Sequence, residues 1–220
     1  MTDLSFVWLE ITGRCQLECR HCYADSGPGG GHGSMTAADW RRVIDQSVEL
    51  GVEMVQFIGG EPTLHPDLPD LLGYALAAGV EVEVFSNLAH VTPALWELFA
   101  QPGVHLACSY YSDRAGQHAA ITGRAGSYAR TRANIGEAVR RSIPLRVGVI
   151  RCLPWILRPS GRGGNGLLRS RAGKVDSPPR RTGVHYSRAR TCDMWTGVLT
   201  WRCLSGDTQA GRVYRRAGGK

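Results

Sequence analysis

The sequence lacks any long run of apolar residues. In its 220 residues, no apolar stretch approaches the roughly 18 consecutive residues that a membrane-spanning helix needs. This excludes a transmembrane segment and a membrane partner. The amino terminus has no basic segment ahead of an apolar core, and its short apolar run meets Glu10, unlike a secretory signal peptide. We therefore expect the chain to stay in the cytoplasm.

Lysine is missing from the first part of the chain, and acidic residues are scarce in the second. Residues 1–150 contain 11 Arg and 16 Asp or Glu, a net charge of −5, whereas residues 151–220 contain 15 Arg or Lys and 3 Asp, a net charge of +12. The chain therefore has two unlike regions. The basic region permits nucleic-acid binding, but it contains no recognised binding module, so nucleic acid is not the expected partner.

Hydrophobic periodicity stops after residue 150. Residues 151–220 hold 11 Gly together with arginine clusters and Pro178-Pro179, and no sustained apolar period. We predict an irregular, disordered basic tail there. Such a composition resembles a GC-rich gene translated in a shifted frame, and a frameshift is our hypothesis for it. An intact in-frame continuation at the locus would refute this hypothesis.

Apolar runs alternate with amphipathic segments in the first 150 residues. Strands are expected at residues 6–11, 54–58, 80–85, 104–108 and 145–150, and helices at 36–50, 67–78, 93–101 and 127–141. On the third strand, Glu81 and Glu83 alternate with valines and are expected to be half exposed. Strands separated by helices should run parallel through right-handed crossovers, which predicts an α/β fold. Periodicity leaves open whether the sheet forms a barrel.

Three of the seven cysteines are tightly clustered. In a reducing compartment they favour metal binding over disulfides. Cys15, Cys19 and Cys22 have C-x3-C-x2-C spacing directly after the first strand, a loop that can wrap around three corners of one cubane cluster and leave the fourth iron open. The alternative is a zinc site completed by His21 or His32, because three Cys and one His also suit tetrahedral zinc.

A glycine pair and an acidic residue directly follow the second expected strand. In Gly59-Gly60-Glu61, the glycines allow the backbone to approach a ligand without a Cβ clash, and the carboxylate offers acceptors to an ammonium group. The next two strands end on polar residues, namely Ser86, Asn87 and Ser109. The carboxyl ends of strands form the active face of barrel enzymes, but such residues also cap turns, and both interpretations stay open.

Further residues receive more general interpretations. The glycine-rich segment 27–33 is expected to be a flexible connector. Cys108 is expected to be a small buried apolar residue within a strand. Arg124 is expected to face either a carboxylate or only solvent.

The cysteine spacing after a first strand resembles the signature of the radical S-adenosylmethionine (SAM) superfamily, and Gly59-Gly60-Glu61 resembles its SAM-binding segment. The resemblance implies a radical SAM core over residues 4–150, as a partial (β/α)6 TIM-like barrel that is incomplete after the fifth strand. It also implies a [4Fe–4S] cluster and SAM. The residues implied are Cys15, Cys19 and Cys22 for the cluster, Gly59, Gly60 and Glu61 for the methionyl amino group, His21 for the adenine, and Ser86, Asn87 and Ser109 for the ribose and carboxylate.

The activity implied by this resemblance is reductive cleavage of SAM to a radical that abstracts hydrogen from a substrate. A flavodoxin or ferredoxin would supply the electron. Residues 9–13 and 59–66 look most like the peptide-maturing branch, so a peptide is the expected substrate. The alternative is a truncated, non-catalytic remnant that binds metal but cannot hold SAM, and whose open sheet leaves an exposed edge.

Overall fold

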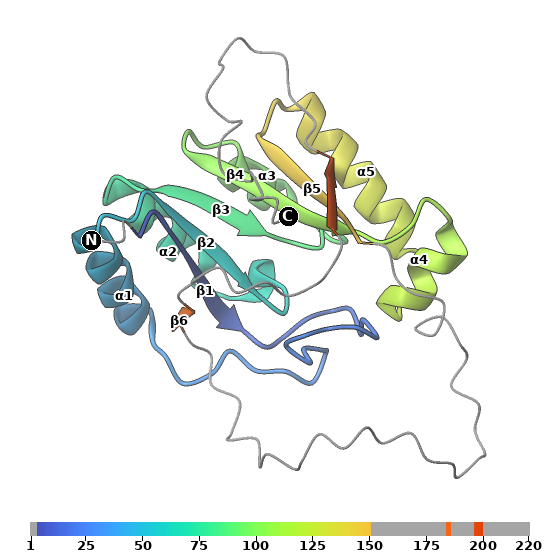
Figure 1. Cartoon of the computed structure of the whole chain (residues 1–220), viewed down its shortest axis with the longest axis horizontal. Coiled ribbons are helices and arrows are strands. Elements are labelled where there is room, and N and C mark those ends of the chain that lie inside the picture. Colours follow the sequence, from blue (N-terminus) through green and yellow to red (C-terminus); the bar gives the residue numbers. More distant parts are fainter. Residues whose placement is uncertain (1–3, 151–183, 186–195, 200–220) are drawn as a thin grey trace, which may run out of the picture.

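The computed structural model describes residues 4–150 and the backbone of two short segments, residues 184–185 and 196–199. Parallel strands form the centre of the molecule and lie side by side in chain order (Figure 1). Their bounds are β1 Phe6–Thr12, β2 Met54–Gly59, β3 Glu81–Phe85, β4 Val104–Tyr110 and β5 Leu145–Ile150. The predicted parallel α/β fold is therefore confirmed.

Helices connect consecutive strands. They are α1 Ala37–Glu49, the short 3₁₀ helix η1 Pro62–Leu64, α2 Leu68–Ala77, α3 Pro93–Phe99, α4 Ala115–Thr122 and α5 Ser127–Arg140. Two of them begin at side-chain caps: at α1, Thr36 and Asp39 form a reciprocal capping box, and at α3 the Thr92 side chain accepts from the Leu95 N–H.

Helix α4 was not predicted from the sequence. It spans only two turns, and Arg114 at its amino end makes no capping hydrogen bond through its side chain. The helix ends at Gly123, which adopts the left-handed conformation with φ of +70°. A short helix without a side-chain cap leaves too weak a periodic pattern to detect.

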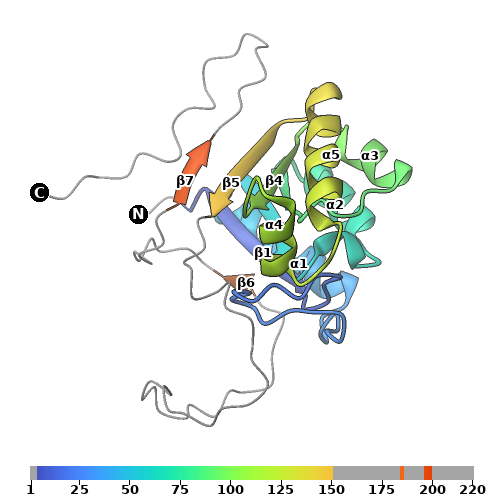
Figure 2. The same cartoon turned by 90° about the vertical axis from the view of Figure 1, so that its right-hand side faces the viewer.

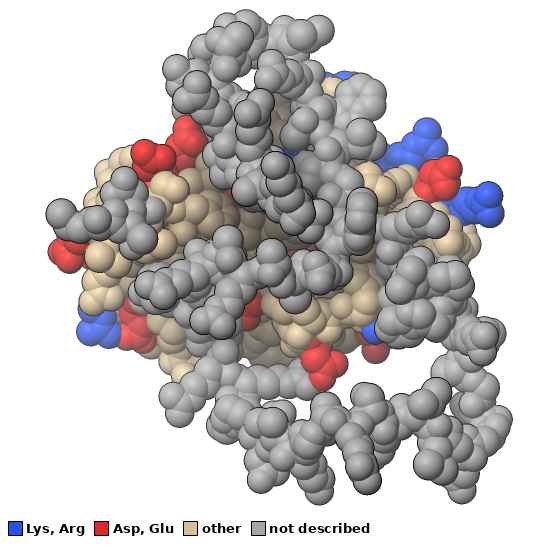
Figure 3. Space-filling model, in the orientation of Figure 1, with Lys and Arg blue, Asp and Glu red and all other residues tan. Residues whose placement is uncertain are grey.

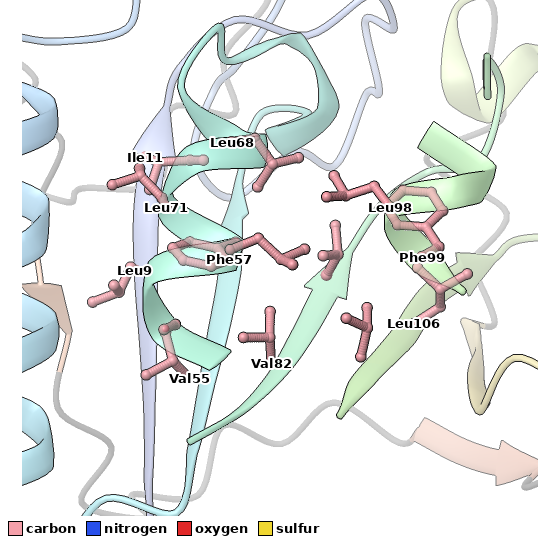
Figure 4. Packing of buried hydrophobic residues seen from close by; sticks show 14 of the residues in the cluster. Leu9, Ile11, Val55, Phe57, Leu68, Leu71, Val82, Leu98, Phe99 and Leu106 are labelled. Atoms are coloured by element: carbon pink, nitrogen blue, oxygen red, sulfur yellow. The ribbon is translucent and has the colours of Figure 1, made fainter. Parts of the chain in front are cut away.

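The hydrophobic core lies between the sheet and the helices that cover one of its faces (Figure 2). Alternate residues of the inner strands point to this face, as expected for strands with a period of two. Figure 4 shows how they pack against α2 and α3. The buried set includes Leu9, Ile11, Val55, Phe57, Val82 and Leu106 from the strands, with Leu68, Leu71, Leu98 and Phe99 from the helices.

The opposite face of the sheet carries a polar network. Glu83 on β3 is only 7% exposed, and its carboxylate accepts from Arg146 Nη2 at 2.6 Å and from the Gln56 side chain. The expectation that Glu83 is half exposed was therefore wrong, because Glu83 is buried. Glu81 on the same strand is exposed. β3 lies between β2 and β4, so neighbouring side chains cover Glu83, and burial of its charge is balanced by the guanidinium.

Two short strands extend the sheet beyond the parallel core. β6 (Val184–His185) pairs antiparallel with β1, and β7 (Thr196–Leu199) pairs antiparallel with β5. The sequence predicted no element here, but the outer strands of an open sheet present unpaired N–H and C=O groups to which another strand can bond. The rest of residues 151–220 lies outside the described residues, and so do the predictions of disorder and of a frameshift that concern them.

Charged side chains lie along the rim of the face drawn in Figure 3. In the visible part of the described chain, red acidic and blue basic side chains occur near one another without a continuous basic area. The ion pair between Arg41 and Asp70 at 2.6 Å links α1 to α2. Among the helices that the structure describes, none combines the length and the apolar content needed to span a membrane.

Candidate active site

The loop that follows β1 brings the three predicted cysteines together. Cys15 is buried, and Cys19 packs against the small cluster that Cys15 forms with Leu17 and Ala89. The Cys22 sulfur lies close enough to Cys15 to contribute to its electrostatic environment. None of these three thiols is in a disulfide. The loop therefore gathers three free thiols, as the spacing predicted.

N–H donors point at two of these sulfur atoms. The backbone N–H of Leu17 donates to Cys15 Sγ at 3.4 Å, and that of Ser26 donates to Cys22 Sγ at 3.4 Å. The side-chain amide of Asn87 lies 3.7 Å from Cys15 Sγ. Such donors suit sulfur atoms that carry negative charge, as thiolates bound to iron do.

The Cys15 thiol is protonated in the absence of a metal. Burial raises its pKa to about 11, and the Glu61 carboxylate and the Cys22 sulfur add to the rise. A bound cation offsets this cost, because metal coordination deprotonates a thiol outright. Three soft thiols with N–H donors around them fit an iron–sulfur cluster ligated at three corners.

The two histidines considered for a zinc site have other neighbours. His32 Nδ1 lies 2.9 Å from Thr12 Oγ1, and its ring packs against His65 at 5.0 Å between centroids. His21 packs its ring against Tyr111 at 4.7 Å. In the part of the chain that the structure describes, no group of three or more Cys, His, Asp or Glu is arranged to hold a single metal ion. In a cubane each thiolate binds a different iron, so its ligands need not converge on one point.

Segment 27–33 is packed onto the start of the cysteine loop, which corrects its interpretation as a flexible connector. Gly13 N–H donates to Gly31 O at 2.8 Å, and Cys15 N–H donates to Gly27 O at 3.0 Å. A Cβ at Gly30 would lie 2.0 Å from Gly13 O. Glycine is needed here because two backbone segments touch, and their contact positions Cys15.

The Gly59-Gly60-Glu61 segment at the end of β2 docks on the other side of the same loop. Gly60 N–H donates to Thr12 O at 2.7 Å, and Glu61 N–H donates to Arg14 O at 2.8 Å. A Cβ on Gly59 would lie 2.2 Å from Thr12 O, and one on Gly60 would lie 2.4 Å from Arg14 O. Both glycines thus have a structural reason that the sequence pattern did not reveal: they allow β2 to contact the backbone leading to the cysteines.

Glu61 connects the ends of β2 and β3. Its carboxylate is 1% exposed and accepts from Asn87 N–H at 2.8 Å, Thr63 Oγ1 at 2.8 Å and Thr63 N–H at 3.2 Å. Burial raises the pKa of Glu61, and these hydrogen bonds oppose that rise. Ser86 is also buried, and its Oγ accepts from Leu88 N–H at 3.0 Å. The predicted residues Glu61, Ser86 and Asn87 therefore lie together beside Cys15.

An aromatic group lies beyond the end of β4. The half-buried ring of His21 contacts Tyr111, and burial lowers the pKa of His21 below its ordinary value, so the ring is neutral at pH 7. Ser109 lies two positions before Tyr111 and pairs with Gly148 of β5. Tyr111 was not among the predicted site residues, although consecutive tyrosines directly after a strand end were a visible signal. Tyr111 lies close to Cys19 and Cys22 and is hydrogen-bonded to the Ser109 side chain, so this group borders the cysteine loop.

The end of α4 and the two residues that follow it contact the cysteine loop. We call residues 121–124 the clamp segment. Arg124 was expected to face a carboxylate or solvent, but its guanidinium donates to a backbone carbonyl of the loop. The contacts are Glu18 N–H to Thr122 O at 3.0 Å, Arg20 N–H to Ile121 O at 3.0 Å and Arg124 Nη1 to Gln16 O at 2.8 Å.

Comparison with known families decides which superfamily the chain belongs to. The radical SAM superfamily matches residues 9–154, which include all three cysteines and the Gly59-Gly60-Glu61 segment. This chain belongs to the radical SAM superfamily. Enzymes of the superfamily use a [4Fe–4S] cluster and SAM, as the sequence resemblance implied.

Peptide-modifying enzymes are among the relatives of this radical SAM chain. It is 34% identical over 146 residues to a PqqA peptide cyclase of Xanthomonas campestris pv. campestris (strain B100), a match that covers 66% of this chain and 39% of the relative. A PqqA peptide cyclase of Ruegeria pomeroyi is 32% identical over 145 residues, covering 64% and 38%. The chain thus spans about two fifths of the length of these relatives.

Solved structures share the fold of the radical SAM core. Streptococcus suis SuiB bound to SAM superposes with a TM-score of 0.57 at 20% identity, covering 66% of this chain and 33% of SuiB. The native anSMEcpe structure with bound AdoMet gives a TM-score of 0.55 at 12% identity, covering 65% and 42%. These likenesses support the partial-barrel architecture that was predicted.

Proposed function

We propose that this chain is the SAM-cleaving core of a radical SAM enzyme that modifies a peptide. The observation that carries the proposal is that one loop brings Cys15, Cys19 and Cys22 together near Glu61, with N–H donors directed at two of the sulfur atoms. The family match over the same residues supports it.

The proposed roles follow from the chemistry of each side chain. When bound at the three cysteines, a [4Fe–4S] cluster supplies an open iron for SAM and the electron that cleaves its sulfonium, so that methionine and, after hydrogen abstraction, 5′-deoxyadenosine are formed. The negative charge of Glu61 attracts the ammonium of SAM. The neutral His21 ring offers an apolar face to adenine.

The remaining site residues divide by exposure. Ser109 and Asn87 are proposed to contact the ribose and the carboxylate of SAM, because both lie at strand ends and are partly exposed. The carbonyl groups of Gly59 and Gly60 are proposed to accept from its amino group, because the Gly60 N–H is already bonded to Thr12 O. Ser86 is 1% exposed and bonded to its own turn, which favours a supporting role behind Glu61.

A peptide is the proposed substrate because of what the relatives act on. Two of them are peptide cyclases, and a SuiB structure contains the precursor peptide SuiA. The cytoplasm, where thiols stay reduced, is the proposed location, with a flavodoxin or ferredoxin as electron donor.

Anaerobic reconstitution with iron and sulfide tests the proposal. The full chain is expected to give a brown protein that forms 5′-deoxyadenosine from SAM with dithionite. Cys19→Ala should lose both cluster and product, whereas Cys108→Ala, which removes a fully buried cysteine outside the motif, should retain both. Zinc in place of iron would favour the zinc alternative, and a cluster without SAM cleavage would favour the non-catalytic remnant.

A further inference from the structure

The side-chain amide of Asn87 has only one possible orientation. Its Oδ1 accepts from the backbone N–H of Ala89 at 2.8 Å, and a backbone N–H can only donate. The atom facing Ala89 is therefore the oxygen, and the NH₂ group must point the other way, toward Cys15 Sγ at 3.7 Å and Gln16 Oε1 at 3.3 Å. Gln16 Nε2 completes the arrangement by donating back to Oδ1 at 3.0 Å.

The backbone of Asn87 is held equally firmly. Its N–H donates to the buried Glu61 carboxylate at 2.8 Å, and its carbonyl accepts from Thr131 Oγ1 at 3.0 Å. With both backbone groups and the side-chain oxygen bonded, rotation of the amide away from Cys15 would break existing hydrogen bonds. The donor is therefore preorganised toward the sulfur rather than placed there by chance.

An N–H group beside a ligand sulfur acts on the cluster's electron affinity. Reduction adds negative charge that spreads onto the sulfur atoms, and a hydrogen-bond donor stabilises the reduced form more than the oxidised form. The Glu61 carboxylate on the other side of Asn87 has the opposite effect on Cys15. Of the N–H donors described at Cys15 and Cys22, those of Leu17 and Ser26 belong to the backbone, so the Asn87 amide is the one that a substitution can remove.

We propose that Asn87 raises the reduction potential of the cluster through the contact of its side-chain NH₂ group with Cys15 Sγ. The cluster is then easier to reduce. This role goes beyond contact with SAM and rests on the proposed cluster function. It makes Asn87 a residue that sets the potential of the cluster directly, independently of whether SAM is bound.

A redox titration of the reconstituted full chain without SAM, followed by electron paramagnetic resonance, tests the proposal. In Asn87→Leu, the ratio of reduced to oxidised cluster at a fixed solution potential should fall about tenfold, a shift of about 59 mV to more negative potential for a one-electron couple. Asn87→Asp keeps an oxygen facing Ala89 and Gln16 but replaces the donor with a negative charge, so the shift should have the same sign and be at least as large.

Asn134→Leu is the matched control. The Asn134 amide donates to Leu88 O at 2.8 Å, so it supports the same turn without reaching a sulfur, and its loss should leave the potential unchanged. An unchanged potential in Asn87→Leu and Asn87→Asp, or an equal shift in Asn134→Leu, overturns the proposal. If the wild-type chain forms no iron–sulfur cluster, the proposed function itself fails, which is a distinct outcome.

Discussion

Arg124 donates a hydrogen bond of 2.8 Å to the backbone carbonyl of Gln16, which lies 108 positions earlier in the chain. Gln16 is next to Cys15, so this bond connects the turn between α4 and α5 to the loop that carries the cysteines. With the neighbouring contacts of the clamp segment, it restrains a loop that otherwise contains little regular structure. The position of the cysteines therefore depends on α4 and α5 as well as on β1.

Gly123→Ala should loosen this restraint. A Cβ there would lie 2.7 Å from Glu18 O, on a residue with φ of +70°. Gly126 is the matched control, because it has φ of +77° and a Cβ added to it would have no atom within 4 Å, so Gly126→Ala carries the left-handed backbone cost of about 1–2 kcal/mol without the contact. Iron release to a chelator should be severalfold faster in Gly123→Ala alone; equal rates would contradict the role of the clamp segment.

Glu83→Gln should destabilise the sheet. The substitution removes the negative charge that accepts hydrogen bonds from Arg146, and hydrogen bonds to charged groups contribute about 1.5–3 kcal/mol to the free energy of unfolding. Glu81→Gln on the same strand is the control, because its pair with His105 is exposed and worth below about 1 kcal/mol. Urea unfolding of the cluster-free proteins measures both, and similar losses would show that burial of Glu83 is unimportant.

His118 should make stability depend on pH. It is 1% exposed, and burial lowers its pKa below the ordinary 6.5. Below pH 6.5 the unfolded chain binds a proton that the folded chain excludes, so stability falls as the pH decreases, by at most about 1.4 kcal/mol per pH unit, until the folded-state pKa is reached. Unfolding free energies at pH 7.5 and 5.5 should differ less in His118→Phe than in the wild type.

The control for this prediction separates the charge of His118 from its packing. Ser127 Oγ lies 3.1 Å from His118 Nδ1, and Ser127→Ala removes that contact while keeping the imidazole buried. This variant should lose stability at both pH values and keep a pH dependence close to that of the wild type. If the unfolding free energy of His118→Phe depended on pH as steeply as that of the wild type, His118 would not be the group responsible for the pH dependence.

Gly60→Ala and Gly73→Ala should have opposite effects on stability. A Cβ on Gly60 meets Arg14 O at 2.4 Å, and relief of such an overlap costs about 1–3 kcal/mol. Gly73 lies in α2 with nothing within 4 Å of a Cβ, so alanine should stabilise the helix by about 0.5–1 kcal/mol. Thermal unfolding measures both changes, and a stable Gly60→Ala would argue against tight docking of β2 on the cysteine loop.

Local patterns were sufficient to predict the strands and most helices. Helices α1 and α3 were predicted from apolar periodicity, and their caps at Thr36 and Thr92 also involve residues only three positions apart. The burial of Glu83 was predicted wrongly and α4 was not predicted, because local patterns were insufficient for both. The burial of Glu83 depends on Arg146, 63 positions away, and α4 has no side-chain cap at its start.

The same division applies to the candidate site. Cys15, Cys19 and Cys22 were recognised from their spacing, and Glu61 from the glycines before it, since both are short contiguous motifs. The link from Asn87 to Cys15 spans 72 positions, and the contact between His21 and Tyr111 joins the cysteine loop to the end of β4. Neither contact could be predicted from the sequence, because such a prediction requires knowing which strands are neighbours in the sheet.

By itself, the sequence determined the alternation of strands and helices, the chemistry of the three thiols and the superfamily, because each is encoded by side chains a few residues apart. The tertiary structure alone decided which groups surround those thiols: the Asn87 amide, the buried Glu61 carboxylate, the Tyr111 ring and the clamp segment. The physical reason is the parallel order of β1 to β5, which brings the carboxyl ends of strands distant in sequence to one edge of the sheet.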